Sequence, residues 1–233
     1  MRDHYQVKIQ RDEMLRYLAY RGSEIDAALE RRIQSARECL EQWAEPQVVW
    51  RSFDLLPDGS LGGTTVRLTG TDIRRHLGGS ERVVLLAVTL GGRVDRLIRT
   101  AEARDMTEAV LLDAAASAGI ESVLDQVEGD LRTELAGENL LLTARFSPGY
   151  GDLPLELQDA ICRTLDTQRR IGIGVSGSGI MIPRKSVTAI LGISRAGEAD
   201  SREHAGWPAC EICRLQGHCS FRQAGGYCGR FEA

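Results

Sequence analysis

The chain has 233 residues, of which 42% are hydrophobic, and its 29 basic and 33 acidic side chains leave a formal net charge of -4. This length and composition allow one large domain, or a domain with an appendage, to bury its own core without a disulfide scaffold. No apolar run approaches the roughly 20 residues that span a bilayer, no apolar secretion signal opens the chain, and no basic patch suits a nucleic acid, so we expect a cytoplasmic protein.

Helices and a pair of strands are expected in the first part of the chain. Apolar residues recur at helical spacing through residues 9–43 with an interruption at residues 22–23, which predicts two amphipathic helices. Residues 48–55 and 63–68 are rich in β-branched side chains and flank a Pro-Asp-Gly turn, so they predict a hairpin-like pair of strands. Another helix is predicted from Thr71 to His76, with His76 on a polar face.

A covered strand and a long helix are expected in the middle of the chain. Residues 82–90 form an apolar run of strand length, which predicts a strand covered on both faces. Helices are predicted over residues 94–103 and 106–131. The second carries a run of small residues at 114–119, and such a face lets another backbone or a ligand approach closely.

The last part of the chain changes character after residue 195. Before it, we expect a strand over residues 140–144, one helix over residues 155–170 and a strand over residues 187–193. Beyond it the sequence becomes charged, Gly-rich and Cys-rich. We therefore expect a domain over residues 1–195 and a peripheral tail over residues 196–233.

The segment Arg145-Phe-Ser-Pro-Gly-Tyr150 combines residue types that bind small molecules. A guanidinium can hold a carboxylate through two parallel hydrogen bonds, Gly149 permits close approach of the main chain, and the tyrosine could cover a flat ring. From residue types alone, the alternative is a strand end and a proline turn, with the tyrosine packed on the core.

Residues 172–179 are rich in glycine but lack the pattern of a nucleotide-binding loop. No helix is predicted after them, and the Lys-Ser/Thr of a phosphate loop is missing. We expect a flexible hairpin or a wall of the ligand cleft, and we include Ser176 and Ser178 among the candidate ligand-binding residues. Lys185 and Ser186 are expected to be exposed residues at the start of a strand.

The tail contains four of the six cysteines, Cys210, Cys213, Cys219 and Cys228. Four thiols within 19 positions, opened by a Cys-x-x-Cys pair, can surround one metal ion. The spacing is neither that of a standard zinc ribbon nor that of a standard ferredoxin, so zinc, an iron–sulfur cluster and free or redox-paired thiols all remain open. Cys39 and Cys162 fall in helical patterns and are expected in the core.

Five segments of the chain are similar to one protein family. They are Arg145-Phe-Ser-Pro-Gly-Tyr-Gly-Asp-Leu-Pro-Leu-Glu-Leu-Gln158, residues 171–174 with 176–178, Pro183-Arg-Lys-Ser-Val-Thr-Ala-Ile-Leu-Gly-Ile193, residues 87–91 and residues 112–117. On these residues the chain resembles the activation, or reactivation, domain of cobalamin-dependent methionine synthase in its free-standing form. The resemblance implies an α+β fold, a single mixed domain with a central antiparallel sheet flanked by helices.

In that family the domain binds S-adenosylmethionine, which methylates cobalamin that has lapsed into the cob(II) state, with an electron from flavodoxin or a ferredoxin-type carrier. The resemblance implies that Arg145 binds the methionyl carboxylate, that main-chain groups near Ser147 contact the ligand, and that Tyr150 lies against it. The full set of ligand-binding residues predicted in this segment is Arg145, Phe146, Ser147, Pro148, Gly149 and Tyr150.

The resemblance further implies a methyltransferase-type component of methionine biosynthesis that acts with a corrinoid partner. The chain lacks the Asp-x-His-x-x-Gly signature of corrinoid modules, so the cobalamin must arrive on another protein. No catalytic acid or base is predicted, because methyl transfer from a sulfonium to a cobalt nucleophile needs positioning and exclusion of water rather than proton transfer.

Two departures from the family pattern affect the predicted pocket. After Gly-Tyr, the domain fused to the synthase continues with Pro-Ala-Cys-Pro, whereas this chain has Gly151-Asp-Leu-Pro154, which alters the rim. The family's acidic ligand residues belong to the preceding helix, where Asp113 and Glu121 lie in the matching region. The cysteine tail is extra to the fused domain.

Two other functions remain open. One is a metal-bearing electron-transfer or redox-sensing protein in which the tail is the working part and the body is a docking platform. The other is an assembly or sensor subunit that binds S-adenosylmethionine without methyl transfer.

Overall fold

A computed structural model describes residues 4–20 and 24–195 of the chain. The helices in these residues are α1 (Arg11–Tyr17), α2 (Ala27–Trp43), α3 (Thr71–His76), α4 (Gly92–Glu102), α5 (Met106–Ala136), α6 (Leu157–Leu165) and α7 (Thr167–Ile171). The strands are β1 (Gln47–Asp54), β2 (Arg82–Thr89), β3 (Leu140–Leu142), β4 (Gly174–Val175), β5 (Met181–Ile182) and β6 (Ser186–Arg195). None of the helices described there is long and apolar enough to cross a membrane.

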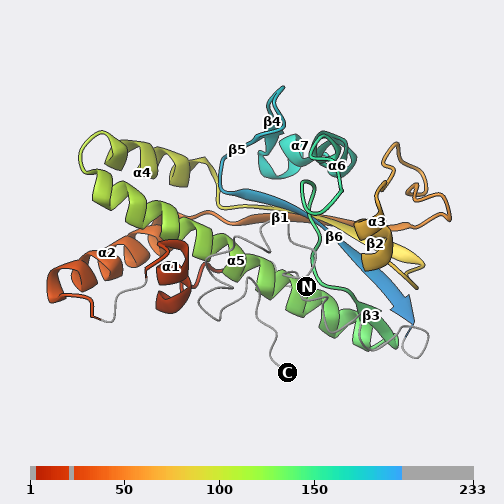
Figure 1. Ribbon diagram of the computed structural model, residues 1–233, viewed down its shortest axis with the longest axis horizontal. Helices are drawn as coiled ribbons and strands as arrows, with labels where there is room; N and C mark the ends of the chain where they lie inside the picture. The colour runs from red at the N-terminus through yellow and green to blue at the C-terminus, as the bar shows by residue number, and fades with distance from the viewer. Residues whose placement is uncertain (1–3, 21–23, 196–233) are drawn as a thin grey trace. The chain divides into compact units, whose positions relative to one another are not determined.

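Four of the strands form one antiparallel sheet in the order β1-β2-β6-β3 (Figure 1). The central strands β2 and β6 are neighbours, and the N–H of Leu90, just after β2, donates to the carbonyl of Lys185, just before β6. At one edge of the sheet, β3 pairs with β6 in the register Leu140 to Arg195 and Leu142 to Ile193. The helices and this sheet together confirm the predicted α+β class.

The predicted covered strand is confirmed in β2. After its first residue, every residue of β2 is buried, and the partner strand β6 is buried at most of its positions. Strands that are covered on both faces need apolar side chains at successive positions, which explains the unbroken apolar run. The core of the sheet is therefore built on its two central strands.

The described residues divide into two compact units. Unit 1 holds residues 4–20, 24–49, 87–130 and 166–187, and unit 2 holds residues 50–86, 131–165 and 188–195. The boundaries fall inside β1, β2, β6 and α5, so each of these elements contributes residues to both units.

Unit 1 is built on α1, α2, α4 and most of α5 (Figure 1). Helix α2 begins at Asp26, whose carboxylate accepts hydrogen bonds from the N–H groups of Ala28 and Leu29, as expected of an N-cap. A side chain at Gly119 of α5 would lie 3.2 Å from a methyl group of Leu40 in α2. The small-residue face predicted on this helix therefore does allow a close approach of its neighbours.

Unit 2 contains α3, α6, β3 and the C-terminal end of α5. Arg132 at that end of α5 donates to the carbonyl groups of Leu142 and Thr143, which ties the helix to the chain leaving β3. Gln158 of α6 and Thr188 of β6 bring their side chains to 3.5 Å in the core of the unit. Through these contacts α5 holds the chain that leaves β3, and α6 packs against β6.

Several predicted elements differ from the observed ones. Residues 63–68 form no named strand: isolated bridges such as Ser60 to Arg67 make them part of a compact loop, and β1 pairs with β2 instead. The single helix predicted over residues 155–170 is broken at Asp166, which has a left-handed φ of 53°. Strand β3 ends at Leu142 rather than at residue 144, and α5 continues to Ala136.

Candidate functional site

The segment from Arg145 to Tyr150 lies in unit 2 and begins on a fixed main chain. Phe146 forms a bridge with Ile190 of β6, in which the two N–H groups donate to the opposite carbonyls at 2.9 and 2.8 Å. The Phe146 side chain is buried, whereas Arg145 and Ser147 on either side of it are half-buried. This alternation is expected of extended backbone, and it directs Phe146 into the core.

A tight turn follows and leaves Tyr150 exposed. The N–H of Tyr150 donates to Ser147 at 3.0 Å, and the N–H of Gly149 donates to Leu153 at 2.9 Å. Gly149 has a φ of 88°, which a side chain would disfavour. The Tyr150 ring is 61% exposed and meets the Phe146 ring edge-on at 6.1 Å. The alternative in which this tyrosine packs on the core is therefore wrong.

His76 is a part of this region that the sequence did not reveal. It was predicted on a polar face of its helix, but it is only 9% exposed and its ring lies 5.1 Å from that of Phe146. Its Nε2 lies 2.8 Å from the carbonyl of Ala144, and since a carbonyl only accepts, Nε2 carries the proton. Burial lowers the pKa of His76, although the bond to Ala144 acts in the opposite direction.

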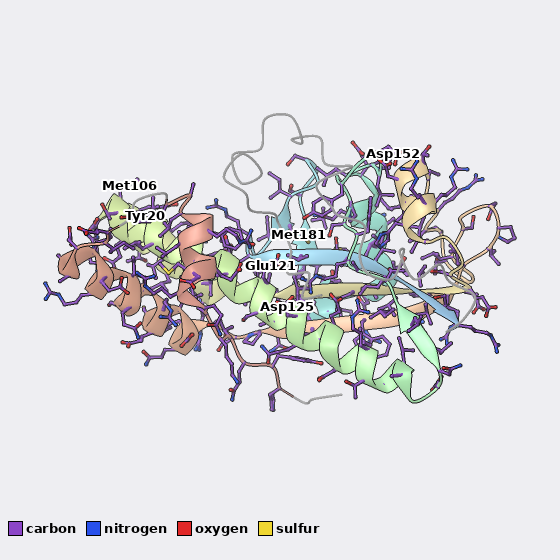
Figure 2. All side chains as sticks on the ribbon, turned by 60° about the horizontal axis from the view of Figure 1, so that its bottom comes forward. Tyr20, Met106, Glu121, Asp125, Asp152 and Met181 are labelled. Atoms are coloured by element: carbon purple, nitrogen blue, oxygen red, sulfur yellow. The ribbon has the colours of Figure 1, made fainter. Side chains whose placement is uncertain are left out.

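Asp152 lies in the segment Gly151-Asp-Leu-Pro154, where the sequence differs from the family that it resembles, and its side chain caps a helix. Helix α3 begins after Gly70, which has no side chain to cap it. The carboxylate of Asp152 takes that role, accepting from the N–H groups of Thr71 at 2.5 Å and Asp72 at 3.1 Å. The bond from Thr71 is the main reason why the pKa of Asp152 is lowered. Figure 2 shows Asp152 beside α3.

The two predicted serines lie in unit 1, in the β4–β5 hairpin that the sequence suggested for the Gly-rich segment. The hydroxyl groups of Ser176 and Ser178 are 2.9 Å apart. The Ser176 hydroxyl also accepts from the N–H of Ile180 at 3.1 Å, so it stabilises its own turn. The predicted residues thus form two groups, one in each unit, and their shared role in binding a ligand stays a prediction.

A second cluster of polar residues in unit 1 surrounds a pocket of about 310 Å³. Asp113, one of the two acidic candidates, lines this pocket, and its carboxylate pairs with Lys185 at 2.9 Å. Lys185 and Ser186 were predicted to be exposed, but the Lys185 side chain is only 14% exposed and Ser186 is buried. Ser186 donates to the carbonyl of Pro183 at 2.7 Å. Glu121 lies further along α5 (Figure 2).

The four cysteines predicted to hold a metal, Cys210, Cys213, Cys219 and Cys228, lie outside the described residues. Within residues 4–20 and 24–195 there is no group of three His, Cys, Asp or Glu side chains that could hold a metal ion. Cys162 is buried as predicted, whereas Cys39 is only half-buried, so its assignment to the core was partly wrong. The tail as a metal site stays a prediction.

No protein-family model and no curated protein sequence matches this chain. Among solved structures, the chain is similar to the MetH reactivation domain bound to AdoHcy, with a TM-score of 0.57 over 96% of this chain and 87% of that chain. The chain has the fold of a methionine synthase reactivation domain. Because only 15% of the aligned residues are identical, this likeness to the reactivation domain concerns the fold.

Proposed function

We propose that this chain binds S-adenosylmethionine and takes part in the reactivation of cobalamin-dependent methionine synthase. The observation that supports this most directly is the shared fold with a reactivation domain bound to AdoHcy, along nearly the whole chain. AdoHcy is what remains of S-adenosylmethionine once its methyl group has been transferred. A fold that accommodates that molecule in one protein is a reasonable scaffold for the methyl donor in another.

In this proposal the ligand segment is Arg145 to Tyr150. Arg145 directly precedes Phe146, whose N–H and carbonyl are both hydrogen-bonded to Ile190 of β6. The main chain that carries the Arg145 guanidinium is therefore already ordered before a ligand arrives. Such ordering lowers the entropy cost of holding a carboxylate. The exposed main chain at Gly149 and the exposed ring of Tyr150 supply close approach and stacking for the rest of the ligand.

The proposed reaction moves one methyl group and one electron. An external carrier reduces cob(II)alamin on the partner protein by one electron, and the resulting cobalt nucleophile takes the methyl group from the sulfonium. The carbon–sulfur bond breaks, a carbon–cobalt bond forms and AdoHcy is left. No proton moves, so the chain's residues would orient the sulfonium and exclude water, and neither task needs a catalytic acid or base.

The binding step is tested by calorimetry with S-adenosylmethionine and with AdoHcy. We expect Arg145→Ala to weaken both by about 2–4 kcal/mol, because a charge-assisted bidentate contact is lost, and Arg145→Lys to recover only part of it. Arg163→Ala is the matched control, since that side chain is 80% exposed and lies in the same unit. Unchanged affinity in Arg145→Ala would show that the ligand segment is misplaced.

The reaction itself is tested by mixing the protein with a corrinoid-binding module in the cob(II) state, a reductant and S-adenosylmethionine. The corrinoid absorption spectrum should change to that of the methylated form, and omission of the protein should abolish the change. Tight binding of S-adenosylmethionine with no spectral change would favour the sensor function over methyl transfer.

A further inference from the structure

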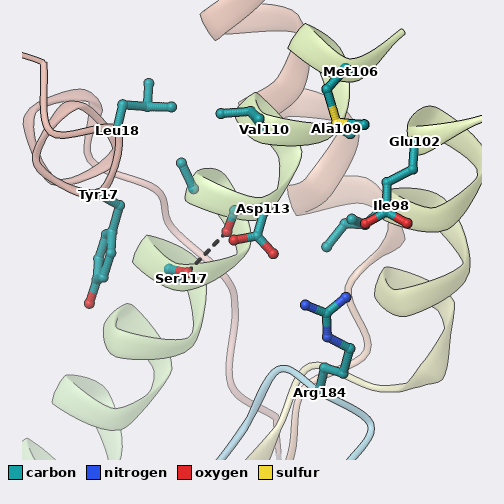
Figure 3. Close-up of a pocket in the computed structure, with 11 residues that line it drawn as sticks. Tyr17, Leu18, Ile98, Glu102, Met106, Ala109, Val110, Asp113, Ser117 and Arg184 are labelled. Atoms are coloured by element: carbon teal, nitrogen blue, oxygen red, sulfur yellow. Dashed lines mark hydrogen bonds between the residues drawn. The ribbon is translucent and has the colours of Figure 1, made fainter. Parts of the chain in front are cut away.

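The pocket in unit 1 is a separate feature from the Arg145 segment, and its walls come from three helices and one loop. Ile98 and Glu102 lie on α4, Asp113 lies on α5 opposite them, and Tyr17 closes one side from α1 (Figure 3). Arg184, in the loop between β5 and β6, reaches in from below in this view (Figure 3). A volume of about 310 Å³ is at the lower end for small-molecule sites, which are roughly 300–1,000 Å³.

One part of the pocket is apolar. Ile98, Ala109 and Ala114 line it and are each no more than 5% exposed. Met106 and Val110 also line it, but they remain 63% and 51% exposed, which is high for such side chains. A small apolar group in the pocket would cover these two side chains and gain the free energy of removing them from water.

The charges around the pocket are not equally available. Asp113 and Lys185 neutralise each other at 2.9 Å, and the Lys185 ammonium also donates to the hydroxyl of Ser117 at 2.9 Å. By contrast, none of the ion pairs found among residues 4–20 and 24–195 includes the side chain of Arg184 or of Glu102. The pocket therefore presents one anion, Glu102 on α4, and one cation, Arg184 on the loop between β5 and β6.

The main chain of Arg184 is fixed in this position. Its N–H donates at 2.9 Å to the carboxylate of Asp95, which is 8% exposed and lies one turn before Ile98 on α4. The other carboxylate oxygen of Asp95 is buried without a hydrogen-bond partner among the described residues. The Tyr17 phenol, which is uncharged at neutral pH, adds a hydrogen-bonding group to the pocket wall.

From this arrangement we propose that the pocket binds a free α-amino acid with an aliphatic or thioether side chain. The carboxylate of the ligand pairs with Arg184, its ammonium pairs with Glu102, and its side chain packs on Ile98, Ala109 and Ala114. A zwitterion with an apolar tail matches all three features. The two charged residues that carry this proposal, Glu102 and Arg184, are not among the residues predicted to bind S-adenosylmethionine, although Asp113, Ser176 and Ser178 lie in the same unit.

The test uses the full chain and titrates L-leucine and L-methionine by calorimetry. Binding should weaken at least tenfold in Arg184→Gln and in Glu102→Gln, each of which removes one charge from a surface side chain. Arg96→Gln, an exposed position on α4 outside the pocket, is the matched control and should bind like the unmodified chain. Arg145→Ala should also leave this binding unchanged, which separates the two proposals.

Modified ligands make the assignment of each charge testable. L-leucinamide lacks the carboxylate, so it should bind weakly to the unmodified chain and lose nothing further in Arg184→Gln. N-acetyl-L-leucine lacks the ammonium and should behave in the same way toward Glu102→Gln. No heat at millimolar amino acid, equal binding of L-leucinamide and L-leucine, or loss of binding in Arg96→Gln would each overturn the proposal.

Discussion

Replacing Thr143 by valine tests the packing behind the Arg145 segment. Thr143 is 1% exposed, and its hydroxyl accepts from the buried N–H of Gly192 at 2.8 Å and donates to Ala144. Valine keeps the shape of the side chain but leaves that N–H inside β6 without an acceptor. An unsatisfied buried donor costs about 1–3 kcal/mol of unfolding free energy. For a chain of this size, that corresponds to a fall in Tm of roughly 2–12 °C.

The measurement is urea unfolding followed by circular dichroism, with the denaturant slope compared between variants. An unchanged slope means that the shift in midpoint reports stability rather than a change in the unfolded chain. Thr100→Val is the control, because the Thr100 hydroxyl is exposed and only donates to the carbonyl of Arg96 within α4. If Thr143→Val unfolds at the same urea concentration as Thr100→Val, the hydroxyl is not satisfying Gly192 and the reasoning fails.

Three further predictions concern pH, backbone strain and helix propensity. The pKa of His76 is lowered in the folded chain, so below about pH 6.5 the unfolded chain binds more protons than the folded chain and the free energy of unfolding falls. His76→Gln should remove this loss of stability, whose slope is at most about 1.4 kcal/mol per pH unit. Identical pH profiles for this variant and for His4→Gln would contradict that. Gly59→Ala should destabilise by about 2–3 kcal/mol, since φ is 84° and the new methyl group would lie 2.5 Å from the carbonyl oxygen of Leu68. Gly129→Ala, on the open surface of α5, should instead stabilise by about 0.5–1 kcal/mol in the same urea unfolding assay.

The elements that the sequence predicted well are those with a strong local pattern. Strand β2 has an unbroken apolar run, and α2 has both an Asp N-cap and apolar residues at helical spacing. The break between α6 and α7 was missed because aspartate gives only a weak signal for the left-handed conformation that Asp166 adopts. Residues 63–68 have the composition of a strand, but they join their neighbours through isolated bridges such as Ser60 to Arg67, and β1 pairs with β2.

The residues missed around the candidate sites depend on contacts that are distant in sequence. His76 follows an arginine in a short helix, and only the packing of α3 against Ala144 and Phe146 buries it. Lys185 was expected to be exposed, and its burial depends on Asp113, 72 residues earlier in the chain. The proposed role of the Arg145 segment rests, in contrast, on residue types that are contiguous in the sequence, and it stays a prediction.

The region around Arg145 is joined to α3 at both ends of that helix. Asp152 caps the first turn, and His76 in the last turn donates to Ala144, the residue before Arg145. The close fit at the first turn favours two glycines: Gly70 and Gly151 both have positive φ, and a Cβ there would meet the carboxylates of Asp152 and Asp72 respectively. The sequence after Tyr150 is therefore constrained by the start of α3. Helix α3 and strand β6 thus hold the main chain on either side of Arg145, through Ala144 and Phe146 respectively.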